Sequence, residues 1–412
     1  MKKIDFARRR FLRDGVAASA GAWAAPLALT ATAATPAPNA EYLEVGLPKS
    51  SLLTPALCVD LDKLEANIDT MQNTVSRNGI GVRPHTKTHK CPAIAHLQME
   101  RGAVGICTAK LTEAEVMFEH GLRQILLTTV NVSTAKIRRA MQLRKQCDGF
   151  IQAVDTEGNA RELNDAAREA GIIADVTVDV DPGGHRSGIT PREPALTLAQ
   201  LIDNLSNLRL RGMLCYDGGS QHVSGFAARR TQAIERMSPA AETFSMMQQS
   251  GLNVEIFSGG GTGTYNIDHA TPGFTDIQSG SYVFMDASYL GIGGQDNDEV
   301  YSDFKPSLTI LTTVVNAQYE GRATTDAGAK SCTINRPWSI VVGETGMSYT
   351  SGSDEYGTIR YENPSRVYQA GDRLELIISH CDPVVNLYDK MYAIRNNRVE
   401  AVWRIAGRGK NQ

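Results

Sequence analysis

The sequence holds 412 residues, with 42 lysines and arginines against 45 aspartates and glutamates and a formal charge of −3 at pH 7. This near balance gives no indication of a nucleic-acid partner, which a strongly basic domain would suggest. The length suits one large domain or two of moderate size, with enough residues to bury a substantial core.

Residues 1–33 have the pattern of a twin-arginine (Tat) export signal. The stretch from Ala7 to Arg13 carries consecutive arginines followed by Phe-Leu, and an alanine-rich apolar stretch and a small-residue cleavage site come next. The apolar stretch is shorter than the roughly 20 residues of a membrane span, and an amphipathic N-terminal helix is the alternative. We expect a periplasmic protein that meets the Tat translocon during export and keeps no membrane span once mature. Loss of the segment removes six cations and two anions, which moves the formal charge to about −7.

Residues 34–54 are expected to be a linker and N-terminal segment, and beyond them strand-like and helix-like stretches alternate. Short apolar runs predict strands, amphipathic stretches between them predict helices, and repeated βα units imply a parallel sheet covered by helices. Eight units over residues 79–288 predict a (β/α)8 barrel. An open doubly wound sheet is the competitor, although no Gly-x-Gly-x-x-Gly opens the first βα turn. The expected barrel strands are 80–83, 103–108, 124–129, 150–154, 174–180, 208–215, 254–257 and 276–278.

Residues 289–412 have a different pattern, in which short β-branched runs are separated by Gly, Asn and Asp without intervening helices. This pattern predicts a mostly antiparallel β domain. Residues 55–78 hold a first strand, 56–61, and a helix, and we expect that strand to join the β domain. The chain would then start in the β domain, build the barrel and return.

Seven cysteines are scattered along the chain, mostly inside apolar runs. In an exported protein, an odd number at irregular spacing argues against a disulfide framework. We expect most of them to be core thiols.

Residues 83–90, with the sequence Arg-Pro-His-Thr-Lys-Thr-His-Lys, follow an expected barrel strand. In a partly desolvated pocket beside other cations, the neutral amine of Lys87 would be favoured and could attack a carbonyl carbon at neutral pH. That is Schiff-base chemistry. On these residues alone, a basic loop without a covalent role remains an equal alternative.

A glycine-rich run, residues 259–264, follows the expected seventh barrel strand, where barrel enzymes often hold phosphate. The backbone of Gly260 and Gly261 can approach an anion closely, and Thr262 adds a hydroxyl donor. Ser281 follows the expected eighth strand at the same end of the barrel. A flexible turn is the alternative for the glycine run.

These two stretches and residues 379–383, Ser-His-Cys-Asp-Pro, resemble in this order the D-threonine aldolase and D-serine dehydratase group of fold-type III pyridoxal-phosphate enzymes. The resemblance covers nearly everything after about residue 55 and implies an alanine racemase-like architecture. It implies pyridoxal 5'-phosphate bound covalently to Lys87, with Arg186 at its phenolic oxygen and Tyr216 close to its ring. Family members are often dimers, so a homodimer stays open beside a monomer.

The resemblance also implies a metal site at His380 and Asp382 in the β domain. If the two residues lie at a strand end, their side chains point the same way, and water and substrate would complete the coordination. Oxygen ligands favour Mn²⁺ or Mg²⁺, with Zn²⁺ as an alternative. His-x-Asp resembles the aldolases and His-x-Cys the zinc dehydratases. A polar strand end without metal is the other interpretation.

The resemblance implies a lyase that cleaves a D-3-hydroxy amino acid such as D-threonine to glycine and an aldehyde. Several D-threonine aldolases place a histidine after the tyrosine near the ring, but this chain has Asp217. Asp217, His222 or water on the metal could therefore take the proton of the β-hydroxyl. The alternatives are a dehydratase of D-serine or 3-hydroxy-D-aspartate, an amino-acid racemase and a non-catalytic pyridoxal-phosphate-binding protein.

Replacing both Arg8 and Arg9 with lysine should leave the protein in the cytoplasm with its N-terminal segment uncut, because the Tat pathway reads that pair. Cell fractionation and immunoblotting measure both the location and the size. Arg13→Lys changes a cation outside the pair and is the matched control, which should be exported normally. Normal periplasmic delivery of the double variant would contradict the export prediction.

Overall fold

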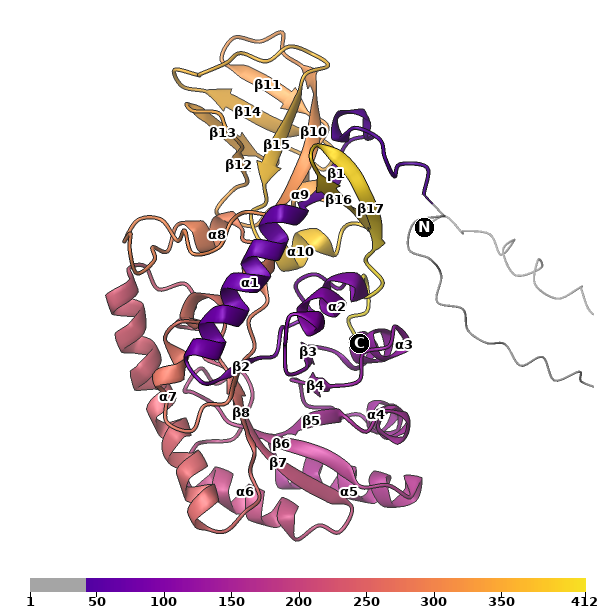
Figure 1. The fold of residues 1–412 in the computed structure, drawn as a ribbon, viewed down its shortest axis with the longest axis vertical. Helices are drawn as coiled ribbons and strands as arrows, with labels where there is room; N and C mark the ends of the chain where they lie inside the picture. Colours follow the sequence, from indigo (N-terminus) through magenta and orange to yellow (C-terminus); the bar gives the residue numbers. More distant parts are fainter. Residues whose placement is uncertain (1–41) are drawn as a thin grey trace, which may run out of the picture. The chain divides into compact units, whose positions relative to one another are not determined.

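The computed structural model describes residues 42–412, which contain a sheet of eight strands and a sheet of nine (Figure 1). The predicted Tat signal and the first part of the predicted linker, residues 34–41, lie outside the described residues. Within residues 42–412, none of the helices combines the length and the apolar character that crossing a membrane requires.

The eight-stranded sheet is parallel and follows the order β2-β9-β8-β7-β6-β5-β4-β3. A parallel bridge between His85, just after β2, and Cys107 of β3 joins its two ends. The predicted (β/α)8 barrel is therefore confirmed. Its strands are β2 (Gly81–Val82), β3 (Ile106–Thr108), β4 (Ile125–Leu127), β5 (Phe150–Val154), β6 (Ala174–Asp179), β7 (Leu208–Cys215), β8 (Ile256–Gly259) and β9 (Asp276–Ile277).

Helices follow the barrel strands, and several begin at residues whose side chains cap them. Ser133 accepts a hydrogen bond from the N–H of Lys136 at 3.3 Å, and Thr156 accepts one from that of Asn159 at 3.2 Å. Such oxygens satisfy N–H groups that a helix start leaves without intrahelical partners. Helix α1 (Leu61–Arg77) precedes β2. The helices that follow barrel strands are α2 (Pro92–Glu100), α3 (Leu111–Glu119), α4 (Thr134–Gln146), α5 (Glu157–Ala170), α6 (Glu193–Asp203), α7 (Phe226–Gln249) and α8 (Ala287–Leu290).

The nine-stranded sheet is antiparallel except where β1 (Ala56–Asp60) pairs in parallel with β16. On its other side β1 pairs antiparallel with β10, and α1 then leads to β2 of the barrel (Figure 1). The mostly antiparallel β domain is confirmed. Its other strands are β10 (Leu308–Asn316), β11 (Arg322–Thr325), β12 (Ile340–Val341), β13 (Met347–Thr350), β14 (Gly357–Tyr361), β15 (Arg373–Ile377), β16 (Lys390–Arg395) and β17 (Arg398–Arg404), with short helices α9 (Ala329–Cys332) and α10 (Cys381–Val385).

The core runs from the barrel into the β domain as one cluster of buried apolar side chains. All seven cysteines are buried and unpaired, so the expected core thiols are confirmed. The barrel also holds a buried ion pair, in which Nε of Arg83 donates to Oδ1 of Asp276 at 3.1 Å. Ser258 bonds the same carboxylate and accepts from Gln278 at 3.0 Å. This polar chain ends at Gln278, which lines the cavity described next.

Candidate active site

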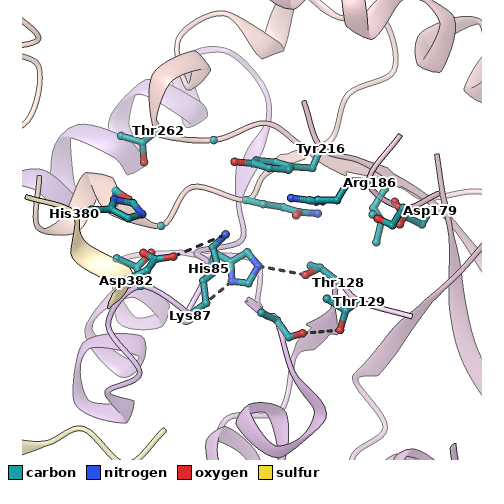
Figure 2. Close-up of a pocket in the computed structure, with 18 of the residues that line it drawn as sticks. His85, Lys87, Thr128, Thr129, Asp179, Arg186, Tyr216, Thr262, His380 and Asp382 are labelled. Atoms are coloured by element: carbon teal, nitrogen blue, oxygen red, sulfur yellow. Dashed lines mark hydrogen bonds and ion pairs between the residues drawn. The ribbon is translucent and has the colours of Figure 1, made fainter. Parts of the chain in front are cut away.

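A cavity of about 550 Å³ lies at the C-terminal ends of the barrel strands and is closed on one side by the β domain (Figure 2). The barrel contributes loops that follow its strands, and the β domain contributes the segment between β15 and α10. Of the predicted site residues, Lys87, Arg186, Tyr216, His222, Gly261, Thr262, Ser281, His380 and Asp382 line the cavity, whereas Asp217 and Gly260 do not.

Lys87 lies in the loop after β2, and Figure 2 shows its amine directed across the cavity toward Asp382. Its Nζ atom is 4.0 Å from Oδ2 of Asp382 and 5.8 Å from the centroid of the Tyr216 ring. The side chain is 38% exposed, so it is partly desolvated and still reachable from the cavity. The amine can therefore meet a carbonyl carbon on a bound ligand.

His85 lines the cavity beside Lys87 and was not predicted as a site residue. The hydroxyl of Thr128 donates to the carbonyl of Thr108 at 3.2 Å, so it accepts the proton on Nε2 of His85, 3.3 Å away. Burial, with the nearby charge of Lys87, brings the pKa of His85 well below its ordinary value. His85 is thus a neutral imidazole with its proton on Nε2. Its place in the same basic stretch as Lys87, directly after a barrel strand, is the sequence signal that could have singled it out.

The loop that carries Arg186 is built around Asp181, which follows β6. Oδ1 of Asp181 accepts the N–H groups of Gly183 and Gly184, both at 2.9 Å, and Oδ2 bonds Nδ1 of His185 at 2.8 Å. Burial acts to raise the pKa of Asp181, but these hydrogen bonds bring it below its ordinary value. Asp181 therefore stays charged and fixes the loop. The Arg186 guanidinium carbon lies 5.1 Å from the centroid of the Tyr216 ring, within range of a cation–π contact (Figure 2).

The turns after β8 and β9 form the wall predicted to bind phosphate. Gly261, Thr262 and Ser281 line the cavity there. The Thr262 oxygen accepts the N–H of Tyr282 at 3.0 Å, which leaves the Thr262 hydroxyl proton free to donate to a ligand.

Gly260 does not line the cavity, so the structure gives no support to its predicted contact with the cofactor. Its φ of +62° suits glycine, and a Cβ there would collide with the carboxylate of Asp268. Glycine is required at this position by the positive φ of the turn and by the carboxylate packed against it.

His222 and Tyr289 form a ring pair in the cavity lining, with centroids 4.3 Å apart. Burial lowers the pKa of His222, so the imidazole is neutral at neutral pH. Nδ1 of His222 is 3.4 Å from the Ser288 hydroxyl.

Asp217 is buried outside this cavity, so the structure does not support it as the base. Its Oδ1 accepts the N–H of Gly219 at 3.0 Å, and its Oδ2 accepts the Ser220 hydroxyl. Nη1 of Arg236 is 3.6 Å from Oδ1. These contacts give Asp217 the role of fixing the loop that leads to His222.

His380 and Asp382 both line the cavity, but the strand argument for their orientation was wrong. Strand β15 ends at Ile377, His380 is the N-cap residue of α10, and Asp382 lies in the first turn of that helix. The two side chains meet because the chain turns into the helix. The intervening Cys381 is fully buried and does not line the cavity.

Asp286, which was not predicted, holds His380 in place. The Asp286 carboxylate is fully buried, and its Oδ2 bonds Nδ1 of His380 at 3.0 Å and accepts the N–H of Cys381 at 2.9 Å. Burial acts to lower the pKa of His380, but the bond to Asp286 and the charge of Asp382 bring it above its ordinary value. A carboxylate on one ring nitrogen leaves the other free as a ligand atom, an arrangement common in metal sites.

Across residues 42–412, no three or more His, Cys, Asp and Glu side chains gather as a complete metal site. His380 and Asp382 alone can supply two protein ligands, which is fewer than a complete site has. Oδ1 of Asp382 is buried and has no hydrogen-bond partner within the described residues, which is costly unless a ligand binds it. The donor set fits a divalent metal ion that takes its remaining ligands from water or substrate.

A (β/α)8 barrel with a lysine facing hydroxyl donors across its C-terminal end, closed by a β domain, defines the architecture of fold-type III pyridoxal-phosphate proteins. The family model described as alanine racemase, N-terminal domain, matches residues 59–288, and a serine dehydratase domain model matches residues 307–394. The chain belongs to this alanine racemase-like family, in the group that contains the D-threonine aldolases and D-serine dehydratases.

Known relatives match almost the whole chain. A 3-hydroxy-D-aspartate aldolase from Paracoccus denitrificans is 33% identical over 89% of this chain and 94% of its own length. A D-threonine aldolase from Arthrobacter is 35% identical over 88% of this chain and 95% of its own. The crystal structure of D-threonine aldolase from Filomicrobium marinum superposes with a TM-score of 0.85 at 33% identity, covering 89% of this chain and 99% of that one. A D-threo-3-hydroxyaspartate dehydratase from Delftia is 32% identical over 68% of this chain and 72% of its own length.

The cavity fits the cofactor of this family. Lys87 presents an amine, Arg186 a guanidinium, and Thr262 and Ser281 present hydroxyls, all along one cavity wide enough for a phosphorylated pyridine and a small substrate. In pyridoxal 5'-phosphate, the amine matches the carbonyl carbon, the guanidinium matches the phenolic oxygen, and the two hydroxyls match the phosphate.

Borohydride reduction of the cofactor-loaded protein should fix the pyridoxyl group on Lys87 and remove the yellow colour. Peptide mapping by mass spectrometry identifies the modified residue. Lys90 is the matched control, because its Nζ donates to Asn411 at 3.0 Å and it does not line the cavity. A pyridoxyl group on Lys90 or Lys110 would show that the assignment to Lys87 is wrong.

Proposed function

We propose that this protein cleaves D-3-hydroxy amino acids with a D-threonine-like side chain into glycine and an aldehyde, using pyridoxal 5'-phosphate and a divalent metal ion. The main support for the proposal is that Lys87, His380 and Asp382 line one cavity, with Nζ of Lys87 4.0 Å from Oδ2 of Asp382. A retro-aldol reaction must act on the amino group and on the β-oxygen of one small substrate. The aldolases among the relatives support the same reaction.

The barrel side of the cavity would hold the cofactor. When bound, pyridoxal 5'-phosphate supplies an electrophilic carbonyl carbon and an electron sink for the bond that breaks. Lys87 would supply the amine that holds it covalently, Thr262 and Ser281 would donate hydrogen bonds to the phosphate, and Arg186 would provide a permanent positive charge beside the phenolic oxygen. Tyr216 would lie close to the ring, and it keeps Arg186 in place through the cation–π contact.

The β-domain side would hold the metal ion on His380 and Asp382. A divalent ion supplies a Lewis acid that lowers the pKa of a substrate hydroxyl. One imidazole and one carboxylate favour Mn²⁺ or Mg²⁺, with Zn²⁺ as an alternative. Asp286 keeps the imidazole of His380 oriented toward the cavity.

His222 is the residue that takes the proton from the β-hydroxyl. Its imidazole is neutral because burial lowers its pKa, and its Nδ1 faces Ser288, which leaves Nε2 to accept the proton. Tyr289 stacks on the ring and restricts its rotation. In this proposal, His222 takes the role of the histidine that several D-threonine aldolases place directly after the tyrosine.

The dehydratase of D-serine or 3-hydroxy-D-aspartate is the competing function, supported by a dehydratase relative. The identity of residue 382 favours the aldolase over the dehydratase, because it is an aspartate and not a cysteine. A hard carboxylate would suit a divalent ion that lowers the pKa of the β-hydroxyl and so favours cleavage of Cα–Cβ, whereas a thiolate-ligated zinc would favour loss of the hydroxyl group.

We further propose that the reaction takes place in the periplasm after Tat export, on the strength of the pattern in residues 1–33. A homodimer is the assembly we propose, by analogy with the family.

The purified protein with Mn²⁺ should convert D-threonine to glycine and acetaldehyde and should lose that activity in EDTA. Asp382→Ala should lower kcat by about 100-fold or more, because the metal ion loses its charged ligand. Chromatography of the amino acid, with aldehyde and ammonia assays, identifies the products. Asp382→Cys should bind Zn²⁺ better and release some 2-oxo acid and ammonia. Wild-type protein that forms ammonia and oxo acid without glycine would replace the aldolase proposal by the dehydratase.

His222→Asn should lower kcat by about 10²-fold to 10⁴-fold, the usual contribution of a general base, while cofactor binding is retained. Asp217→Asn is the matched control, since its side chain is outside the cavity and should affect stability more than turnover. Steady-state kinetics and a thermal melt of each variant separate the two effects. The assignment fails if Asp217→Asn has the large loss of kcat and His222→Asn does not.

A further inference from the structure

Arg229 on α7 is fully buried. Among residues 42–412 its guanidinium bonds no carboxylate, and Asp303 acts on it only as a nearby charge. Its guanidinium donates only to backbone carbonyls. The hydrogen bonds run from Nε to Gly263 at 2.7 Å, from Nη1 to Val223 at 2.8 Å and Ile292 at 3.0 Å, and from Nη2 to Gly293 at 2.7 Å. A buried charge of this kind is expensive, and an apolar side chain of similar volume often stabilises a protein as well or better. The four hydrogen bonds compensate this cost, and they tie the guanidinium to the segments that carry these carbonyls.

The four carbonyls belong to three chain segments that are distant in sequence. Gly263 follows Thr262 in the predicted phosphate turn, Val223 follows His222, and Ile292 comes three residues after Tyr289. Each of these segments places one side chain in the active-site cavity: Thr262, His222 and Tyr289.

Arg229 itself does not line the cavity, so it acts on a ligand only through these segments. Two further bonds tighten the same arrangement. The Tyr301 hydroxyl donates to the carbonyl of Thr262 at 2.6 Å, and the N–H of Gly225 donates to that of Ile292 at 2.8 Å. Because the carbonyl of Gly263 bonds Arg229 and that of Thr262 bonds Tyr301, the turn that contains both residues is kept in one orientation. A guanidinium suits this role because its planar fork presents five donors in fixed directions, whereas a lysine presents a single point charge.

We propose that Arg229 is a positioning residue that couples the phosphate turn to the His222–Tyr289 pair. Through its carbonyl bonds, the turn that receives the cofactor phosphate and the loop that carries the proposed base share one rigid support. Loss of the guanidinium loosens both at once, without removing any group that touches a ligand. This inference goes beyond the proposed function, because it concerns cofactor affinity and loop order whichever bond the site breaks.

The test compares Arg229→Met, Arg229→Lys and Arg229→Ala with Arg144→Met in the full chain. Arg144 is a buried arginine on α4 that bonds Asp148 at 3.1 Å and lies outside the cavity lining, so its variant controls for the loss of any buried guanidinium. Titration of each apoprotein with pyridoxal 5'-phosphate, followed by absorbance, gives the dissociation constant. Amide hydrogen exchange of the apoproteins reports order in segments 220–225, 260–264 and 289–293.

Arg229→Met should weaken cofactor binding by about tenfold or more, since several charge-assisted hydrogen bonds are lost, and should speed exchange in all three segments. Arg229→Lys should be intermediate. Guanidinium ion at millimolar concentration should restore affinity to Arg229→Ala, and methylammonium should not. Arg144→Met should keep wild-type affinity and exchange in these segments even if it melts earlier.

Unchanged cofactor affinity in Arg229→Met overturns the proposal, and so does faster exchange confined to one segment. If Arg229→Met does not fold, the comparison of Arg229→Lys with Arg144→Met decides by the same two criteria. A wild-type protein that binds pyridoxal 5'-phosphate but leaves D-threonine intact would sink the proposed function and leave this inference standing.

Discussion

Closure of the barrel is the constraint on which the rest of the site depends, because it occurs through the loop that carries Lys87. The N–H of Thr86 donates to the carbonyl of Cys107 at 2.9 Å, and the N–H of Cys107 donates to that of Pro84 at 2.8 Å. These two bonds continue the parallel sheet past the end of β2 and join it to β3. Lys87 comes directly after this junction, so the position of its backbone is set by the strands on both sides.

The second half of the site depends on one buried carboxylate. Asp286 lies at the start of α8, caps that helix through the N–H of Tyr289 at 3.0 Å, and bonds both His380 and the N–H of Cys381. The segment after the barrel and the segment after β15 are thereby joined within one hydrogen-bond network. A charge that is fully buried needs such a set of donors, and the same donors fix the distance between the two halves of the cavity.

Much of the fold could be predicted because strand and helix patterns are local. The alternation of short apolar runs with amphipathic stretches gave the eight barrel strands, and the β-branched runs after residue 289 gave the second domain. The lysine, the arginine and the His-x-Asp pair were predicted by resemblance, and the structure places all of them in one cavity.

The differences between the predicted and the observed cavity lining have a common physical cause, since each depends on a tertiary contact. Gly260 is explained by the carboxylate of Asp268 behind it, and Asp217 by the loop donors that turn it away from the cavity. Asp286 belongs to no motif, because its importance comes from His380, which is 94 residues away in sequence. His380 and Asp382 were expected at a strand end but lie at the start of α10, and a short polar stretch does not distinguish the two.

The pairing of β1 with both β10 and β16 also sets an order of assembly during synthesis. β1 leaves the ribosome before any barrel strand, but its partners are residues 308–316 and 390–395, near the other end of the chain. A growing chain can complete the whole barrel while β1 still lacks both neighbours. The barrel side of the cavity, with Lys87, is thus synthesised before the β-domain side, with His380 and Asp382. The molecule has both sides only when its last strands have been made.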